Sequence, residues 1–441
     1  MSEHEAHEPP GSVSDPVTTP RAAHATEVLL VFLALGLRCF GGPIAHLGYF
    51  RAEFVERRRW LDAGSFAELI ALCQFLPGPA SSQVGLSIGL LRAGYLGALA
   101  AWAGFTLPSA VAMIAVAAGV TASAGPLALG ALHGLRLVAV AIVTQAVWGM
   151  ARTLTPDRNR LLIGVAALMA LLAIHSGYAQ IAVLLGGGIA GLWLCRRSAH
   201  REARVPGMRD AAEPAGPAEP AGPAGTWVQG PDTLEMIPVG AGAGRAALAA
   251  YLVLLVGLPV AVATVPVQGL ALFEAFYRAG ALVFGGGHVV LPLLHEAVVT
   301  PGWLSDSTFL AGYGAAQALP GPLFTFAAYL GALVSLPPGG VAGALIALVG
   351  IFLPGMLILV GVLPFWAWLR RYALARAVIQ GVNAAVVGLL AAALYNPIWT
   401  TAVARATDIE LVAAAVVMLM LARVPPVVVV IAGAGVGMLI G

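Results

Sequence analysis

The stretch Gln74-Phe-Leu-Pro-Gly-Pro-Ala-Ser-Ser-Gln-Val-Gly85 decides the fold, because the chain repeats its core as Gln317-Ala-Leu-Pro-Gly-Pro322. In both copies two prolines flank a glycine, between apolar runs that otherwise favour helix. Proline removes a backbone donor and fixes φ, so each copy ends one helix and begins the next. Within a hydrophobic segment, such unpaired backbone is tolerated only where it is buried in protein or lines a cavity. Each copy therefore predicts a broken helix at a place that can hold a solute.

The composition indicates a membrane protein. Of 441 residues, 59% are hydrophobic and 10% are charged, and apolar runs of membrane-spanning length recur along most of the chain. We therefore expect an all-α polytopic membrane protein. Cys39, Cys73 and Cys195 are spaced for neither a disulfide framework nor a metal site, so we expect free thiols and no bound metal.

Two polar stretches divide the chain. Residues 1–25 lack the layout of a cleaved signal peptide, and we expect them to form a disordered cytoplasmic tail. Residues 196–245 are rich in Pro, Ala and Gly, a composition that cannot bury a core and is typical of an extended linker, here cytoplasmic. The membrane part then consists of a first repeat at 26–195, an extra transmembrane span at 246–267 and a second repeat at 268–441.

The two repeats match in one slowly drifting register. Phe40-Gly41-Gly42-Pro43 matches Phe284-Gly285-Gly286-Gly287 at an offset of 244 residues. The proline motifs follow at an offset of 243, and Leu107-Pro108 matches Leu353-Pro354 at 246. Chance does not readily produce such a series, so we infer a duplicated fold.

The arginines predict that the second repeat is inverted. In the first repeat, arginines cluster in the loops at 51–59, 92, 152–160 and 196–204, which the positive-inside rule places in the cytoplasm. The equivalent of the first of these loops, residues 295–306, contains no arginine and so has changed sides. One additional span between the halves produces this inversion, and the pattern is that of an inverted repeat. The N-terminus is then cytoplasmic and the C-terminus periplasmic.

The same arginines favour re-entrant hairpins. If residues 26–58 and 64–92 each crossed the membrane fully, the arginine clusters that follow them could not all be cytoplasmic. Two helical hairpins that enter and leave on one side satisfy every cluster, with Phe-Gly-Gly and Leu-Pro-Gly-Pro as their tips. The alternative is an ordinary pair of kinked spanning helices.

The hairpin tips are the candidate substrate site. A helix that begins at a tip offers free N–H groups and partial positive charge, which together receive an anion without burying a full side-chain charge. Glycines at the tips let the backbone approach a ligand closely. The competing interpretation is a purely structural kink, with the two histidines serving in packing or loop hydrogen bonds. The candidate residues are Gly41, Gly42, His46, Pro77, Gly78, Pro79, Ser81, Ser82, Gln83, Gly285, Gly286, Gly287, His288, Pro320, Gly321, Pro322 and Thr325.

Five ionisable residues lie within apolar segments, where such residues are functional candidates by default. Arg38 precedes the first tip and is a candidate for substrate contact, although it could instead snorkel to the interface. Glu68 and Arg136 are candidates for coupling or pairing. Glu274 and Arg278 stand four residues apart and could form a local ion pair.

Missing motifs narrow the function further. The chain has no lysine, and thus no Gly-x-x-x-x-Gly-Lys phosphate loop, so nucleotide-driven pumping is not expected. It also lacks zinc-protease and Gly-x-Ser-x-Gly signatures. Secondary transport remains, with neither enzymatic activity nor a cofactor expected.

Several motifs together resemble the chromate ion transporter family in its long, two-domain form, over about residues 28–440. They are Leu35-Gly36, the run from Phe40 to Gly48, the run from Gln74 to Pro79, and Gly302-Trp303-Leu304 in the second half. The resemblance implies an inner-membrane carrier that exports chromate and confers chromate resistance, with sulfate as the analogue that competes. The expected partners are this oxyanion and the lipid bilayer; a homodimer is possible, and nucleic acid is not expected.

Two departures from the family pattern bear on the site. Arg38 stands where we expect a small or hydroxyl residue, and the second tip continues with Leu323-Phe324-Thr325 instead of Ser81-Ser82-Gln83, which argues against a symmetric site. Two other functions stay open. A carrier or channel for sulfate or another oxyanion would share every motif. A polytopic membrane enzyme would have to use His295, Glu296 and Asp306, the one loop cluster that could serve.

Overall fold

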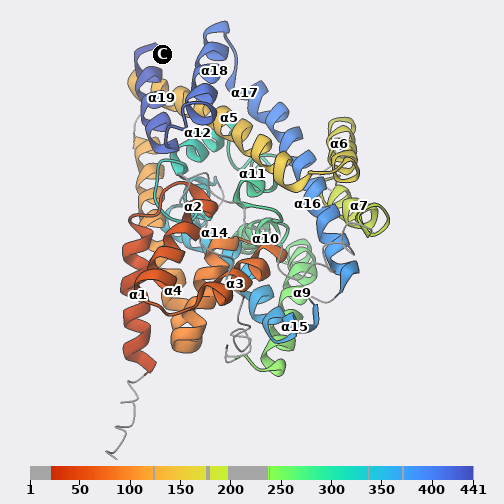
Figure 1. The fold of residues 1–441 in the computed structure, drawn as a ribbon. Coiled ribbons are helices and arrows are strands. Elements are labelled where there is room, and N and C mark those ends of the chain that lie inside the picture. The colour runs from red at the N-terminus through yellow and green to blue at the C-terminus, as the bar shows by residue number, and fades with distance from the viewer. Residues whose placement is uncertain are drawn as a thin grey trace, which may run out of the picture.

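The computed structural model is all-helical in the part of the chain that it describes, which is residues 21–122, 125–174, 179–196, 237, 239–335, 337–369 and 372–440 (Figure 1). The first half contains α1 (Arg21–Gly36), α2 (Gly42–Phe50), the π-helix η1 (Arg51–Arg57), α3 (Ala63–Phe75), α4 (Ala80–Ala122), α5 (Pro126–Leu154), α6 (Arg158–Ala173) and α7 (Ala179–Leu194). The second half contains α9 (Ala241–Thr264), α10 (Gln268–Ala281), η3 (Gly287–Val289), α11 (Val290–Val298), α12 (Asp306–Ala316), η4 (Leu323–Thr325), α13 (Phe326–Leu333), α14 (Gly340–Val362), η5 (Leu363–Phe365), α15 (Trp366–Leu369), α16 (Ala373–Ala393), η6 (Leu394–Trp399), α17 (Thr400–Ala402), α18 (Ala406–Met420) and α19 (Pro426–Ile440).

The helix boundaries differ from the sequence prediction at two places. Helix α1 begins at Arg21, inside the predicted tail, and α9 begins at Ala241, inside the predicted linker. Both helices extend beyond their apolar runs, since a first turn needs no apolar residues and its free N–H groups can face water. The rest of the predicted tail, residues 1–20, and residues 197–236 of the linker lie outside the described residues.

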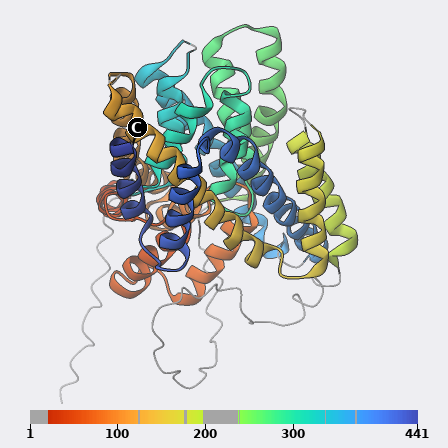
Figure 2. The same ribbon diagram turned by 90° about the horizontal axis from the view of Figure 1, so that it is seen from above.

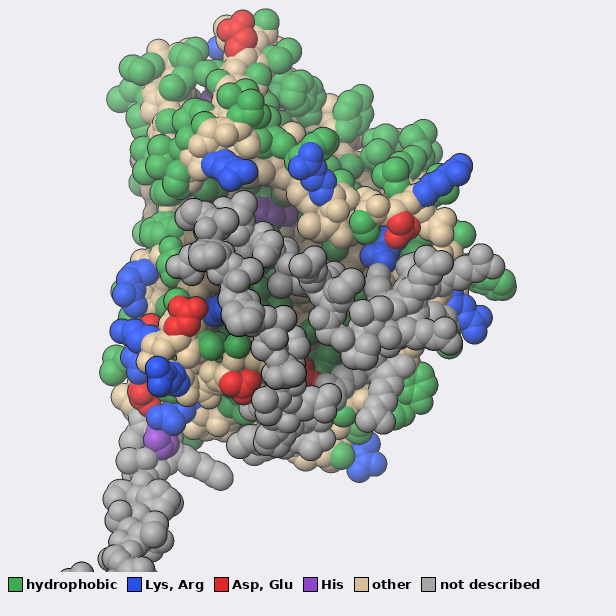
Figure 3. All heavy atoms as spheres, viewed as in Figure 1, with side chains coloured by type: hydrophobic (Ala, Val, Ile, Leu, Met, Phe, Trp, Pro, Cys, Tyr) green, Lys and Arg blue, Asp and Glu red, His purple; other side chains and the backbone are tan. Residues whose placement is uncertain are grey.

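Long apolar helices make this a multi-pass membrane protein. Five helical segments of the described chain are long and apolar enough to cross a bilayer: α4, α5, α9, Gly340–Leu369 and Ala373–Ala402. Large apolar side chains such as Trp193 and Leu439 are more than 80% exposed, as expected for a surface that faces lipid. Figure 3 shows hydrophobic side chains over the upper part of one face, with arginines and acidic side chains grouped at its lower left, beside α1.

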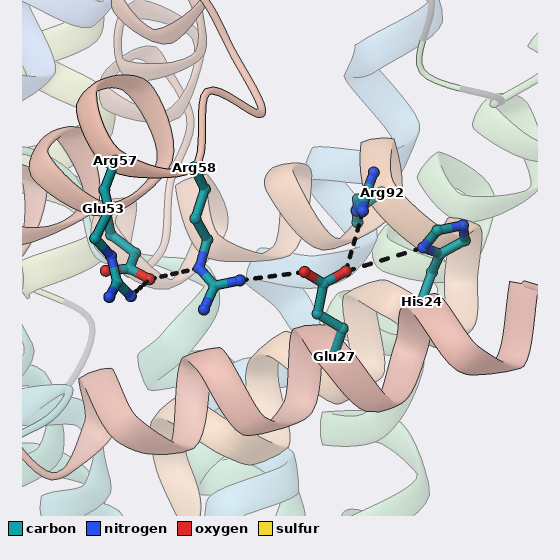
Figure 4. A network of polar contacts seen from close by, with 6 residues as sticks. All are labelled: His24, Glu27, Glu53, Arg57, Arg58 and Arg92. Carbon is teal, nitrogen blue, oxygen red and sulfur yellow. Dashed lines mark hydrogen bonds and ion pairs between the residues drawn. The ribbon is translucent and has the colours of Figure 1, made fainter. Parts of the chain in front are cut away.

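The first two hairpins each return to one edge of the molecule. Arg58, just after η1, forms an ion pair with Glu27 near the start of α1, at 3.1 Å. Arg92 forms another with the same Glu27, at 3.0 Å, and it lies directly before a kink at Ala93 and Gly94 that divides α4. Figure 4 shows this network, in which Glu53 also binds Arg57 and Arg58. We call this end of the molecule, defined by Glu27, Arg58 and Arg92, the arginine edge.

In the second half the chain folds back in the same way. Between α12 and α13 it turns at the second Leu-Pro-Gly-Pro motif, and the two ends of this hairpin meet where the Ser335 amide donates to the Trp303 carbonyl, at 3.2 Å. The Tyr329 hydroxyl, on α13, donates to the Thr308 carbonyl on α12, at 3.0 Å.

The matching long helices α4 and α14 run in opposite directions. One hydrophobic cluster contains Ala98 from the early part of α4 and Leu359 from the late part of α14. A second cluster contains Met113 from late in α4 and Ala344 from early in α14. After its kink α4 continues for about 40 Å, so its end at Ala122 lies far from the arginine edge. We call that opposite end, defined by Ala122 and Pro126, the far edge.

The last helices of each half pack against the other half. Helix α19 lies along α5, and a Cβ on Gly134 would come within 2.0 Å of the Gly433 carbonyl oxygen. Helix α7 lies along α16, and a Cβ on Gly381 would come within 2.1 Å of the Gly187 carbonyl oxygen. Figures 1 and 2 show α6 and α7 together at one side of the molecule, beside α16. This exchange makes the two halves one interlocked body.

Candidate functional site

All four predicted tips break their helices at glycines with positive φ. The angle is +97° at Gly41, +118° at Gly78, +74° at Gly285 and +100° at Gly321. Gly42 and Gly286 are also positive, at +78° and +142°. Side chains with a Cβ rarely adopt these angles, which is the physical reason that the motif repeats glycine at each tip.

The tips of one half bind the tips of the other in a crossed pair. The Gly78 amide, in the first Leu-Pro-Gly-Pro motif, donates to the Val283 carbonyl, next to the second Phe-Gly-Gly motif, at 2.8 Å. The Gly321 amide, in the second Leu-Pro-Gly-Pro motif, donates to the Cys39 carbonyl, next to the first Phe-Gly-Gly motif, also at 2.8 Å. If each residue is replaced by its counterpart in the other repeat, each of these two bonds becomes the other. Two halves related by a two-fold axis would make such reciprocal contacts.

The proline-containing parts of the long helices close this junction. A Cβ on Gly78 would lie 3.0 Å from the Cα of Gly355, which follows Pro354 in α14. A Cβ on Gly321 would lie 2.6 Å from the hydroxyl of Ser109, which follows Pro108 in α4. The two Leu-Pro-Gly-Pro motifs thus face equivalent places on the two long helices.

Gln83 fixes the first of these motifs. Its side-chain amide donates to the Pro77 carbonyl, at 2.9 Å, and to the Gly355 carbonyl, at 3.0 Å. The residue is fully buried, and Pro79 lies against the same Gly355. The predicted Gln83 therefore positions the tip. Its side-chain oxygen Oε1 has no hydrogen-bond partner among the described residues.

Buried polar side chains collect around the start of α4. The His46 ring nitrogen Nδ1 lies 3.3 Å from the Ser81 hydroxyl, and the ring meets Phe105 edge to face at 5.2 Å. Both polar residues are at most 3% exposed. Four buried polar atoms of this cluster have no hydrogen-bond partner among the described residues: His46 Nε2, Ser82 Oγ, Gln83 Oε1 and Thr106 Oγ1. Such atoms are rare in folded proteins, and a ligand or water can satisfy them.

The second half does not reproduce this cluster. At the offsets of the repeat, Val290 replaces His46, Phe324 replaces Ser81 and Phe352 replaces Thr106. The rings of Phe324 and Phe352 instead pack on each other at 5.8 Å. The expected asymmetry of the site thus has a structural form: three positions that are polar in the first half are apolar in the second, and Ser82 is matched by Thr325, whose hydroxyl donates to the Pro322 carbonyl.

The second-half tips also differ from the predicted helix starts. Each begins with a short 3-10 turn, η3 at Gly287 and η4 after Pro322, whereas α2 and α4 begin as α-helix directly after their motifs. The cause at η4 is local, since the Thr325 hydroxyl and amide both donate to the Pro322 carbonyl, at 2.8 and 3.0 Å. His288 lies 2.6 Å from the Tyr313 hydroxyl, and Gly287 faces Pro43 of the first tip. Pro320 lies between α12 and η4.

The charged candidates lie away from the buried cluster or have partners of their own. Arg38 is exposed, and its Nε donates to the Ala34 carbonyl of its own helix, at 2.9 Å. Glu274 and Arg278 form the predicted local ion pair, at 2.9 Å. Glu68 is half-buried on α3. Arg136 is half-buried on α5, and its Nη2 lies 3.4 Å from His133 Nδ1.

The loop cluster of His295, Glu296 and Asp306, considered above for an enzyme, makes hydrogen bonds that connect neighbouring segments. His295 binds Asp306, at 2.7 Å, and this contact connects α11 to the start of α12. The Thr300 hydroxyl donates to Glu296, at 3.0 Å.

Sequence reasoning missed Thr106 and Ser109. Both are 1% exposed, and they flank the Leu107-Pro108 pair of α4. The Leu107-Pro108 pair is one of the repeated motifs of the sequence. The hydroxyl residues on either side of it could therefore have identified these two positions as candidates.

These features define a membrane transporter built from two related halves, with broken helices that meet across the junction between them. The sequence profile of the chromate transporter family matches residues 26–192 and again 270–438. The chain therefore belongs to the chromate transporter family, which is a family of transporters and not of enzymes.

Characterised and uncharacterised relatives agree with this assignment. The chain is 28% identical to a chromate transport protein of Pseudomonas aeruginosa over 390 residues, which cover 87% of this chain and 84% of the relative. It is 27% identical to a probable chromate transport protein of Synechococcus elongatus over 368 residues, 82% of each chain. An uncharacterized transporter of Bacillus subtilis is 37% identical over 124 residues, 28% of this chain and 61% of the relative. No solved structure matches the fold.

Proposed function

We propose that this protein exports chromate across the bacterial inner membrane as a secondary transporter and thereby confers chromate resistance. The observation that carries the proposal is the buried cluster of His46, Ser81, Ser82 and Thr106 beside the crossed tips. Family membership supports an oxyanion as the substrate.

Neutral donors suit a dianion in this environment. Hydroxyl, imidazole and amide groups can satisfy the oxygens of chromate without burying an arginine, which is costly in a membrane. Chromate and sulfate are both tetrahedral dianions, so a cage of donors built for one will hold the other. An inside-negative potential favours efflux, by about 2.3 kcal/mol per charge for each 100 mV.

We place the arginine edge in the cytoplasm and the far edge in the periplasm. The hairpins that carry the first two tips would then enter from the cytoplasm and the hairpins of the second half from the periplasm, as an inverted repeat of re-entrant segments. The return of Arg58 and Arg92 to Glu27 supports this reading of the first half. The antiparallel course of α4 and α14 supports the inversion.

Growth and flux together test the function. A chromate-sensitive host that expresses this chain should grow at chromate concentrations that stop the empty-vector control. Everted membrane vesicles should take up labelled chromate, more so when an inside-positive potential is imposed, and unlabelled sulfate should compete. No protection at normal membrane abundance would count against chromate export. Sulfate flux without chromate flux would instead favour a sulfate carrier, the second candidate.

A further inference from the structure

A second polar site lies at the far edge, apart from the tips. A cavity of about 440 Å³ opens there between the first turns of α5 and the segment from α17 to α18. Its polar lining comes from His133 and Arg136 on α5, from Thr401 on α17 and from Arg405 directly before α18. None of the tip residues contributes to it.

The charges around this cavity are mainly positive. Among the described residues, the carboxylate of Asp408 contacts this lining, and it is 2% exposed and already engaged. It binds His133 Nε2 at 2.9 Å and accepts the backbone amides of Ala404 and Arg405, at 3.0 and 2.9 Å. Asp408 therefore fixes His133 and the start of α18, while the guanidinium groups of Arg136 and Arg405 remain on the cavity wall.

Among the described residues Arg136 makes only long hydrogen-bond contacts, and the charge of Asp408 also acts on it. Its Nε lies 3.4 Å from the Leu132 carbonyl and its Nη2 lies 3.4 Å from His133 Nδ1. A guanidinium presents five donors in a planar fork that matches tetrahedral oxyanions, and two such 3.4 Å contacts leave most of them unused. Arginines at this edge also run against the positive-inside rule, which calls for a reason other than topology.

The repeat itself shows that the second half lacks this arrangement. Gly134 of α5 matches Gly381 of α16 at an offset of 247 residues. At this offset Gln380 stands in place of His133 and Asn383 in place of Arg136. The helix of the second half therefore has neither the histidine nor the arginine. This one-sidedness fits a vestibule at one face of the membrane better than a structural element that both halves need.

We propose that this cavity is a vestibule that binds a tetrahedral oxyanion at the far edge, with Arg136 and Arg405 as its ligands and His133, fixed by Asp408, as a positioning residue. The choice of oxyanion rests on the proposed function. The site would hold the anion on the periplasmic side of the tips, as an exit site during export.

A cysteine in the cavity wall gives a local test that does not depend on transport. Thr401→Cys, in a chain whose three native cysteines are replaced, should react faster with an anionic methanethiosulfonate than with a cationic one. Sulfate should slow this reaction in a concentration-dependent way. Arg136→Gln should weaken sulfate protection by about tenfold, since hydrogen bonds to charged groups contribute on the order of a factor of ten or more. Arg405→Gln, at an exposed position where folding is not at risk, should weaken it as well.

The matched control is Arg152→Gln. Arg152 lies on the same helix, away from this cavity, with its guanidinium over the Trp148 ring, so sulfate protection should be unchanged. Absence of sulfate protection, or protection that survives both Arg136→Gln and Arg405→Gln, would overturn the vestibule. Vesicle flux is measured in parallel with the thiol labelling. If the variants lose sulfate protection but the unmodified protein transports neither chromate nor sulfate, the proposed function is refuted and the vestibule still stands.

Discussion

Ser82 is a residue whose side chain costs folding free energy and is at the same time a candidate for substrate contact. Its hydroxyl is buried and has no hydrogen-bond partner among the described residues. A buried polar group without a partner costs folding free energy, and use by a ligand is one reason for a protein to retain it. At the residue scale, the buried groups that weaken the fold are therefore the best candidates for substrate contact.

We predict that Ser82→Ala leaves thermal stability unchanged or slightly higher while it lowers chromate flux by about tenfold, because a hydrogen bond to a charged ligand contributes about 1.5–3 kcal/mol. Ser87→Ala is the matched control on the same helix. Its hydroxyl is buried but donates to the Gln83 carbonyl, at 2.9 Å, so its loss should cost about 1 kcal/mol and spare the flux per folded molecule. Melting in detergent and vesicle flux check both. A Ser82→Ala protein that transports normally would remove Ser82 from the site.

Residue types alone predicted part of this site. His46, Ser81, Ser82 and Gln83 were expected because they follow tip glycines and prolines, and the structure buries all four. The sequence did not predict that Gln83 positions the first tip, since its acceptor, the Gly355 carbonyl, lies 272 residues away. No local pattern in a sequence reports a contact of that kind.

At the scale of elements, the glycines of the tips both break the helices and form contacts between the halves. Gly78 and Gly321 have φ values of +118° and +100°, and each donates its amide across the junction between halves. The breaks could be read from the sequence because Pro-Gly-Pro is a local signal. The 3-10 starts of the second half could not, because Thr325 and Leu323 have no special preference that distinguishes a 3-10 turn from an α-helical one.

Gly78→Ala and Gly321→Ala should each impair transport more than membrane abundance. Alanine at these angles is strained by about 1–3 kcal/mol, and its Cβ would press on Gly355 or Ser109. The strain falls on the tips, while the packed clusters on either side are untouched. Gly119→Ala is the control, since Gly119 lies in α4 with open space around it. Flux normalised to folded protein in vesicles is the measurement. Equal loss of flux and of folded protein would favour a purely structural kink.

At the scale of the whole molecule, duplication explains the architecture. The crossed amide bonds and the exchange of α7 and α19 repeat under the slowly drifting offset of the two repeats, and α4 and α14 are matching helices that run antiparallel. The repeat and the arginine distribution predicted two related halves of opposite orientation. They did not predict that the last helices of each half would pack on the other, because small-residue pairs such as Gly134 and Gly433 are identified only once both partners are placed.

Duplication with later divergence also accounts for the asymmetry. The fold needs both pairs of tips, so their glycines and prolines are present twice. The polar side chains of the first half are matched in the other copy by the apolar Val290, Phe324 and Phe352 and by Thr325.

The side of the membrane from which each half inserts can be measured directly. Glu56 and Thr300 occupy equivalent positions after the first hairpin of each half, and both are exposed. In a chain whose native cysteines, all buried, are replaced, Glu56→Cys and Thr300→Cys can be labelled in intact cells with a thiol reagent that does not cross the membrane. An inverted repeat predicts that Thr300→Cys is labelled from outside and that Glu56→Cys is labelled only after the membrane is opened. Labelling of both from the same side would contradict it.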